Sequence, residues 1–341
     1  MRFCFKNWFL FLLIILISSF SCSRKELIYK FNPKNPKIAL VISGPVSDSS
    51  WNAEAYAGLK RFKADYGRTE IAVVEKVNLS DLKPVIHELV KGQFDLIFAN
   101  GYEFSKVIQK IAYKYPQTFF CVIGGEISKP PNFCSLNFRD EQYGYLVGTI
   151  SGLNTTTNMV GIVVGGKIPA VERTIIGIRK GLRAVNPKAD LVVSYIKSWS
   201  DVAKGKEAAQ TQINTGVDVI THLADIAGIG VIKAAEEADI SVIGAIKDQH
   251  DIAPGTIITS AIQDVSQLVY IGCENYIDQS LKPKSYRYGL KHQVIDLSPT
   301  YGNIEPTTEN RINRIKDQLT DIEVTQDELL EEHWKKTKLA K

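Results

Sequence analysis

Nine short apolar runs rich in β-branched residues recur along this chain, and a stretch of helical periodicity follows nearly every one of them. Strands that are apolar throughout and alternate with helices are typical of parallel sheets covered by helices on both faces. The chain has 341 residues, which is more than one hydrophobic core usually serves. We therefore predict an α/β protein with two doubly wound parallel-sheet lobes, and a single β/α barrel is the alternative. The expected strands are 37–43, 70–75, 95–99, 118–124, 160–165, 190–194, 217–221, 241–245 and 256–260, and the expected helices are 53–65, 81–91, 103–114, 141–152, 170–184, 201–214, 227–238 and 265–279.

The first 22 residues have the composition of an export signal. Arg2 and Lys6 precede a continuous apolar run over 8–17, and small serines lead to Cys22. This pattern is similar to a bacterial lipoprotein signal peptide, which predicts that residues 1–21 are removed and that Cys22 is acylated. An uncleaved transmembrane anchor is the alternative. Residues 22–36 are polar and contain two prolines, so we expect a lipidated tether that holds an extracytoplasmic domain at the cell membrane.

Composition and motif spacing argue against several classes of function. The net charge is only +4 and no basic block stands out, so nucleic acid is not expected as a partner. The five histidines are scattered and no nucleophile motif is present, so we expect neither an enzyme nor a bound metal or cofactor. Segment 161–168 approaches a nucleotide P-loop, but Ile168 stands where a Ser or Thr would hold magnesium. Cys121, Cys134 and Cys273 are expected as buried core residues, with a Cys121–Cys134 disulfide left open.

The turns at the carboxyl ends of the predicted strands carry the residues that suit a small ligand. The turn 44–52 combines hydroxyls with Asp48, Trp51 and Asn52, which can stack on a flat ring and bond its edge. A helix N-cap, with Trp51 closing the core, is the alternative role. Such turns meet at one edge of a parallel sheet, so we expect them to face a crevice between the lobes. His222 also ends a strand, and we interpret it as a satisfied core or rim histidine, with ligand contact as the alternative. The predicted ligand-binding residues are Asp48, Ser50, Trp51, Asn52, Tyr102, Phe104, Glu126, Trp199, Asp225 and Asp248.

An ordered set of short stretches runs through most of the chain after residue 37. These stretches are Asp48–Asn52, Asn100–Ser105, Tyr115–Pro116, Gly144–Gly148, Ser198–Asp201, Ala227–Gly230 and Ile243–Gln249. In them the chain resembles the basic membrane protein family of substrate-binding lipoproteins, which includes purine-nucleoside receptors of ABC transporters.

The resemblance implies a periplasmic-binding-protein-like fold with a hinge, a small-molecule ligand and an ABC permease as partner, and we expect a monomer. It also implies that Trp51 and Trp199, from opposite lobes, sandwich a flat base. With a hinge, lobe 1 is expected to comprise 37–139 plus about 262–285, and lobe 2 to comprise 140–261 plus about 286–341.

Three positions depart from the family pattern. Family members usually carry Asp at the positions of Gly124 and Ile246 and Lys at that of Gln263, and the last two grip the ribose. Without that grip a buried ribose would lose hydrogen-bond partners, so we expect a purine base to bind more tightly than its nucleoside. The predicted function is capture of a purine base or nucleoside for an ABC importer. The alternatives are a ligand-sensing lipoprotein for another small ring or polyol, and a surface adhesin.

Overall fold

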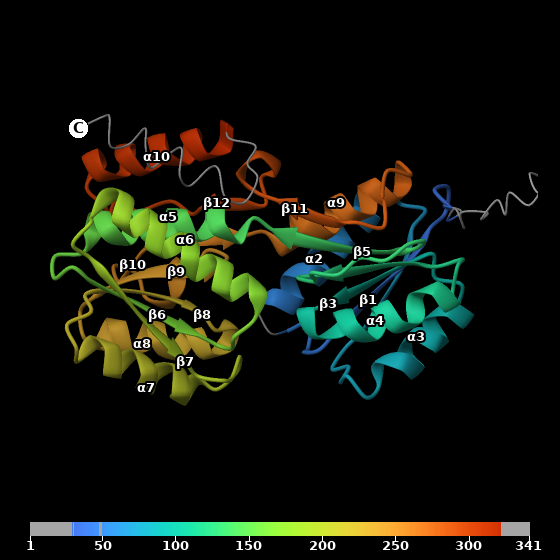
Figure 1. The fold of residues 1–341 in the computed structure, drawn as a ribbon, viewed down its shortest axis with the longest axis horizontal. Helices are drawn as coiled ribbons and strands as arrows, with labels where there is room; N and C mark the ends of the chain where they lie inside the picture. The colour runs from blue at the N-terminus through green and yellow to red at the C-terminus, as the bar shows by residue number, and fades with distance from the viewer. Residues whose placement is uncertain (1–28, 30, 48–49, 322–341) are drawn as a thin grey trace, which may run out of the picture.

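The computed structural model describes residues 29, 31–47 and 50–321, which form two α/β lobes side by side (Figure 1). Each lobe is built on a six-stranded sheet. The order in lobe 1 is β11-β5-β4-β3-β1-β2, and the order in lobe 2 is β12-β10-β9-β8-β6-β7. The two open sheets confirm the two-lobed prediction and exclude the barrel. The strands of lobe 1 are β1 (Lys37–Ile42), β2 (Glu70–Val74), β3 (Leu96–Asn100), β4 (Phe119–Ile123), β5 (Phe133–Phe138) and β11 (Ser285–Tyr288).

The strands of lobe 2 repeat this arrangement. They are parallel except for the edge strand β12, which runs antiparallel to β10. They are β6 (Met159–Val164), β7 (Asp190–Tyr195), β8 (Val219–Leu223), β9 (Ser241–Ile246), β10 (Ile257–Gln263) and β12 (Ile295–Leu297). In both lobes the central strands are buried along nearly their whole length, as the continuous apolar runs predict.

Helices cover both faces of each sheet (Figure 1). Around lobe 1 lie α2 (Trp51–Asp65), α3 (Leu82–Lys91), α4 (Ser105–Ile111) and α9 (Val265–Ile277). Around lobe 2 lie α5 (Asp140–Asn154), α6 (Pro169–Val185), α7 (Val202–Ile213), α8 (Gly228–Glu237) and α10 (Pro306–Asp321). None of the helices that the structure describes is both long enough and apolar enough to cross a membrane.

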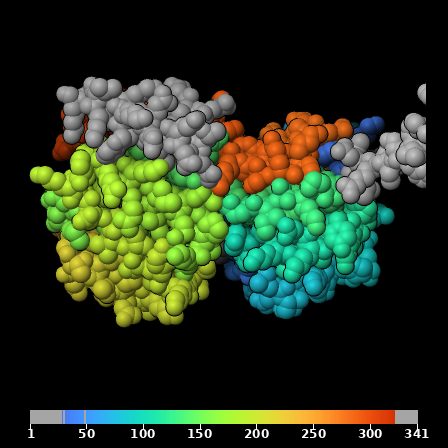
Figure 2. All heavy atoms as spheres, viewed as in Figure 1, coloured from blue at the N-terminus to red at the C-terminus, as the bar shows by residue number. Residues whose placement is uncertain are grey.

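The chain passes between the two sheets three times, because β5 leads to α5, β10 leads to α9, and β11 leads to β12. Backbone hydrogen bonds tie these crossovers together: the Arg139 amide donates to the Tyr288 carbonyl at 2.7 Å, and the Asp264 amide donates to the Val294 carbonyl at 2.8 Å. Figure 2 shows the lobes in contact, with an indentation where they meet on the edge away from α10. Three closely bonded crossovers form a junction about which two rigid lobes can rotate.

The sequence did not predict β5, β11 and β12. In β5 the buried side chains of Ser135 and Asn137 interrupt the apolar run, and they donate to the carbonyls of Ile127 and Gly125. The other two are short edge strands, and β11 pairs with β5 while β12 pairs with β10. A helix was expected over 103–114, where α4 is flanked by 3₁₀ turns at Tyr102–Phe104 and Ala112–Lys114.

The three cysteines within the described part of the chain are free and buried, as expected for core residues. Cys121 and Cys134 are direct partners in the parallel register of β4 and β5. Burial raises the pKa of the Cys121 and Cys273 thiols well above the ordinary value, which makes them poor nucleophiles. Cys22, the predicted acylation site, lies outside the described residues.

A candidate ligand site between the lobes

The Trp199 indole packs against the backbone of two consecutive glycines. It belongs to the loop between β7 and α7, and its ring covers Gly165 and Gly166, which follow β6. A Cβ atom at Gly165 would lie only 2.4 Å from Cε3 of the indole, and a Cβ atom at Gly166 would lie 3.3 Å from Cζ2. The Trp199 residue nevertheless remains 39% exposed. An indole that rests on backbone and stays open to solvent is available to stack on a flat ring.

Trp51 has a different support in lobe 1. It begins α2 and is partly buried, with its ring 6.0 Å from that of Phe138 in an edge-to-face arrangement. Its Cζ2 atom lies 3.7 Å from the position that a Cβ atom would take at Gly124. Gly124 has a φ of 74°, so the turn after β4 uses a backbone conformation that favours glycine. A side chain at Gly124, where the family pattern has Asp, would therefore lie in contact with this indole.

Asn52 is held by a second amide that the sequence did not single out as a ligand contact. Asn100, the last residue of β3, donates from Nδ2 to the Asn52 Oδ1 at 3.1 Å, and both residues are buried. The Oδ1 atom of Asn100 is buried and has no hydrogen-bond partner in the described structure. A buried acceptor without a partner is costly, and at the carboxyl end of a parallel strand it suits a ligand donor.

Ser50 and Asp225 bring the two lobes into direct contact. The Ser50 hydroxyl, just before α2, donates to Asp225 Oδ1 at 2.6 Å, and Asp225 follows β8 in lobe 2. Asp225 has a φ of 48°, a conformation that Asp tolerates better than most residues. Two predicted site residues from opposite lobes therefore meet at the junction. Asp48, which was predicted beside them, lies outside the described residues.

Two other predicted residues of lobe 1 differ in position. Tyr102 is half-buried at the start of the turn after β3, on the edge that faces the junction. Phe104, in contrast, is fully buried in the apolar cluster between the sheet and helices α3 and α4. Its assignment to the ligand site is corrected here, because a ring enclosed by core side chains has no surface for a ligand in this conformation.

Glu126 belongs to a cluster of charges at the junction. Arg173 Nη2, from α6 of lobe 2, lies 2.6 Å from Glu126 Oε1 and 2.7 Å from Asp140 Oδ2. Arg287, from β11 of lobe 1, approaches Glu126 and Glu141 at 3.5 Å. Burial raises the pKa of Asp140 to about 7, although the Arg173 guanidinium opposes this shift. This cluster was not predicted, because its members come from four separate segments that only the fold brings together.

The turn after β9 is stabilised by hydrogen bonds to buried groups of lobe 2. Gln249 Oε1 accepts from the Ala245 amide at 2.8 Å and lies 3.0 Å from His222 Nε2. Burial lowers the pKa of His222 to about 4, so the ring is neutral near pH 7 and serves as a core residue, in line with the predicted interpretation. Asp248 is exposed, and it accepts from the His250 amide at 3.0 Å and from the Tyr301 hydroxyl.

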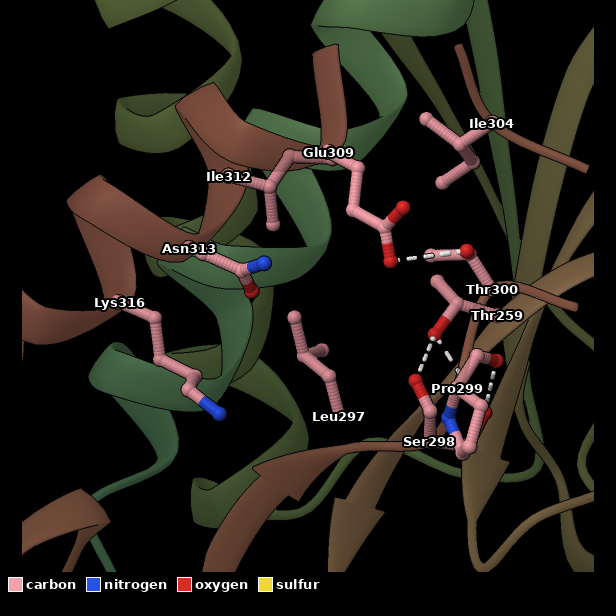
Figure 3. Close-up of a pocket in the computed structure, with 10 residues that line it drawn as sticks. All are labelled: Thr259, Leu297, Ser298, Pro299, Thr300, Ile304, Glu309, Ile312, Asn313 and Lys316. Carbon is pink, nitrogen blue, oxygen red and sulfur yellow. Dashed lines mark hydrogen bonds between the residues drawn. The ribbon is translucent and has the colours of Figure 1, made fainter. Parts of the chain in front are cut away.

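A separate cavity lies between α10 and the strands β10 and β12 of lobe 2 (Figure 3). Its volume is about 230 Å³, and residues of β10, β12 and α10 line it. Thr300 Oγ1 donates to Glu309 Oε1 at 2.9 Å across one wall. Thr259 Oγ1 donates to the Ser298 carbonyl at 2.9 Å. The first bond links α10 to the segment that precedes it, and the second ties that segment to β10. Within the described residues, no group of His, Cys, Asp and Glu side chains has a metal-binding arrangement.

Comparisons with known proteins agree with this architecture. The family described as ABC transporter substrate-binding protein PnrA-like (Bmp) matches residues 35–328. Basic membrane protein A1 of Borrelia garinii subsp. bavariensis is 29% identical over 325 residues, which cover 92% of this chain and 94% of that protein. An ABC transporter solute-binding protein from Conexibacter woesei is 25% identical, with a TM-score of 0.68 over 85% of this chain and 99% of that chain. A solute-binding protein from Aeropyrum pernix, at 20% identity, shares the fold with a TM-score of 0.74 over 89% of this chain and 98% of that chain.

Proposed function

Because the chain belongs to the family of PnrA-like ABC transporter substrate-binding proteins, we propose that it captures a purine base between its lobes and delivers it to a membrane permease. The observation that carries this proposal is the packing of the Trp199 indole against the backbone of Gly165 and Gly166. An exposed indole with a rigid backing offers a flat apolar face, and base–aromatic stacking contributes about 1–3 kcal/mol per base. Trp51 supplies the second indole from the opposite lobe.

The edge of the base needs hydrogen-bond partners, and lobe 1 offers them. Asn52 and the buried Asn100 acceptor lie beside the start of α2, and Asp48 precedes them in the sequence. Carboxylate and amide oxygens accept hydrogen bonds from the exocyclic amino group of adenine or guanine. Asp225 from lobe 2 accepts from the Ser50 hydroxyl at 2.6 Å, which brings its carboxylate to the same junction.

Two features of lobe 2 support a base in preference to a nucleoside. Ile246 ends β9 with an apolar side chain and offers a sugar hydroxyl no partner. Gln263, the other departure from the family pattern, donates through Nε2 to Asp140 Oδ1 at 3.3 Å and is thereby used within the junction. A buried ribose would leave its hydroxyls unpaired, at about 1–3 kcal/mol per group.

The location of the protein follows from its N-terminus and its family. We propose that residues 1–21 are an export signal, that acylated Cys22 anchors the chain to the outer face of a cell membrane, and that residues 22–36 let a monomeric receptor reach its permease. The partners are thus a small molecule, the membrane and the permease.

Calorimetric titration of adenine, guanine, adenosine and guanosine tests the proposal. We expect the bases to bind and each nucleoside to bind at least tenfold more weakly than its base, since each unpaired group costs about 1–3 kcal/mol. Tighter nucleoside binding would assign the sugar to other residues of the crevice. Failure of all four compounds to bind or to raise the melting temperature would contradict the purine assignment.

A further inference from the structure

Arg173 joins the lobes outside the residues proposed to contact the ligand. It lies on α6 of lobe 2, and its guanidinium is shared between Glu126 of lobe 1 at 2.6 Å and Asp140, which begins α5 after the first crossover, at 2.7 Å. The Arg173 side chain is only 13% exposed and that of Asp140 only 3% exposed. Arg287 of β11 flanks the same two acidic elements, through Glu126 and Glu141.

The position of Glu126 depends on the angle between the lobes. Glu126 follows β4 and moves with lobe 1, whereas Arg173 moves with lobe 2. Rotation that separates them would remove one carboxylate from a largely buried guanidinium and leave both groups less well paired. The contacts of Arg173 with Glu126 and Asp140 are short and charge-assisted, so separating Glu126 from Arg173 forfeits a strong contact across the lobes. The cluster therefore favours the arrangement of the lobes in which all its members meet.

We propose that Arg173 and Glu126 form a latch that holds the lobes together in the ligand-free protein, so that Arg173 is a positioning residue for ligand capture. The latch assigns Glu126 to the junction and not to the ligand. It biases an equilibrium between open and closed arrangements, and ligand affinity then depends on the fraction that is already closed. The proposal concerns the ligand-free protein and stands whether or not the ligand is a purine.

Small-angle scattering of the ligand-free protein tests the latch, with Glu126→Gln as the first variant. This change removes the interlobe charge but leaves Arg173 paired with Asp140 and Glu141. The matched control is Glu172→Gln, which makes the same charge change at the residue next to Arg173. The partners of Glu172 are Tyr195 and Lys167, which both belong to lobe 2. We expect a larger radius of gyration for E126Q and an unchanged radius for E172Q.

Calorimetry with adenine separates the latch from a ligand contact. If Glu126 is a latch, E126Q weakens adenine binding about threefold to tenfold together with the increase in radius, since affinity falls with the closed fraction. If binding weakens while the radius of gyration stays unchanged, Glu126 is a ligand contact and the latch is overturned. If neither the radius nor the binding changes, the latch is also overturned. If adenine does not bind at all, the scattering result alone decides the latch.

A second variant keeps the test decisive if E126Q does not fold. Arg173→Lys retains the charge but loses the planar fork that reaches two carboxylates at once. We expect R173K to increase the radius in the same direction and by a smaller amount. A radius equal to that of the wild type in folded R173K would overturn the latch.

Discussion

The two lobes share one strand order but differ in the turn after their fourth strand. In lobe 1 that turn passes through Gly124, with a φ of 74°, and in lobe 2 it passes through Ile246, with a φ of 71°. The left-handed conformation costs a glycine nothing but is strained for a β-branched residue. Both positions face the junction at the carboxyl edge of their sheets. Backbone strain of this kind is typical of functional sites.

The lobes also differ in what they bury beside the site. Val41 of β1 pairs with Ala99, whereas the corresponding Val163 of β6 pairs with His222. Lobe 2 therefore holds a titratable ring where lobe 1 holds a methyl group. Asp140 adds a second buried titratable group on the lobe 2 side of the junction. The comparison predicts a pH dependence from His222 and Asp140, beside that of Asp95 and Glu103 in lobe 1, whose pKa burial also raises.

The largest expected effect is on the pH dependence of the free energy of unfolding, where two contributions oppose each other in the wild-type protein. The pKa of His222 is about 4 in the folded state against an ordinary 6.5, so the unfolded state binds more protons and the free energy of unfolding falls as the pH drops from 6.5 to 4. The pKa of Asp140 is about 7 against an ordinary 3.8, so the folded state binds more protons and the free energy of unfolding falls as the pH rises from about 4 to 7. The two contributions oppose each other over nearly the same interval.

Urea unfolding of single variants between pH 4 and 7 separates these contributions. Relative to the wild type, Asp140→Asn should lose more stability on acidification, because the His222 contribution is no longer opposed by that of Asp140. Relative to the wild type, His222→Gln should lose more stability as the pH rises, because the Asp140 contribution is no longer opposed by that of His222. Parallel curves for both variants and the wild type would contradict the assignment of either buried group.

The next effect concerns the two indoles. Trp199→Ala and Trp51→Ala should each weaken adenine binding about fivefold to 150-fold, since each removes a stacking contact of about 1–3 kcal/mol. The fold should persist, because Trp199 is largely exposed and Trp51 is only partly buried. Tyr113→Ala, which removes an exposed aromatic of lobe 1 outside the site, is the control for calorimetry. Normal binding by either Trp variant would break the proposed sandwich.

The glycines that support the indoles should respond differently to a methyl group. In Gly165→Ala the new Cβ would lie 2.4 Å from the exposed Trp199 ring, so the ring must move and adenine binding should weaken several-fold with little loss of stability. In Gly124→Ala the new Cβ would lie 3.7 Å from Trp51, an ordinary contact. There the positive φ should lower the free energy of unfolding by about 1 kcal/mol while binding changes little. If the two variants change adenine binding equally, the packing of Trp199 against Gly165 does not contribute to binding.

The smallest expected effect is a change of selectivity at Ile246. Ile246→Asn keeps a residue that tolerates the left-handed backbone and adds an amide for a sugar hydroxyl. One net hydrogen bond of about 1 kcal/mol should shift the ratio of adenosine to adenine affinity about fivefold toward the nucleoside. Ile246→Val should leave the ratio unchanged. An unchanged ratio in the Asn variant, measured by paired titrations, would place the ribose pocket elsewhere.

The sequence by itself determined the two α/β lobes, because apolar runs and helical periodicity are local properties. All nine expected strands are present, and the departures at Gly124 and Ile246 lie at the carboxyl edges where the resemblance led us to look. The strand β5 escaped prediction because the partners of its buried polar side chains become adjacent only when the chain folds. Ser135 illustrates this, since its hydroxyl finds the Ile127 carbonyl in the folded chain.

Only the tertiary structure decided how the residues of the candidate site are used. In the sequence, Gly165 and Gly166 belong to a segment that only partly matches a nucleotide P-loop. Their contact with the Trp199 ring forms only when the chain folds. Glu126 is in sequence one more carboxylate after a strand, but folding brings the Arg173 guanidinium to it from 47 residues away. Local patterns specify which side chains reach the edge of a sheet. The packing of one lobe against the other determines whether a side chain there is left for a ligand or is taken by a partner in the protein itself.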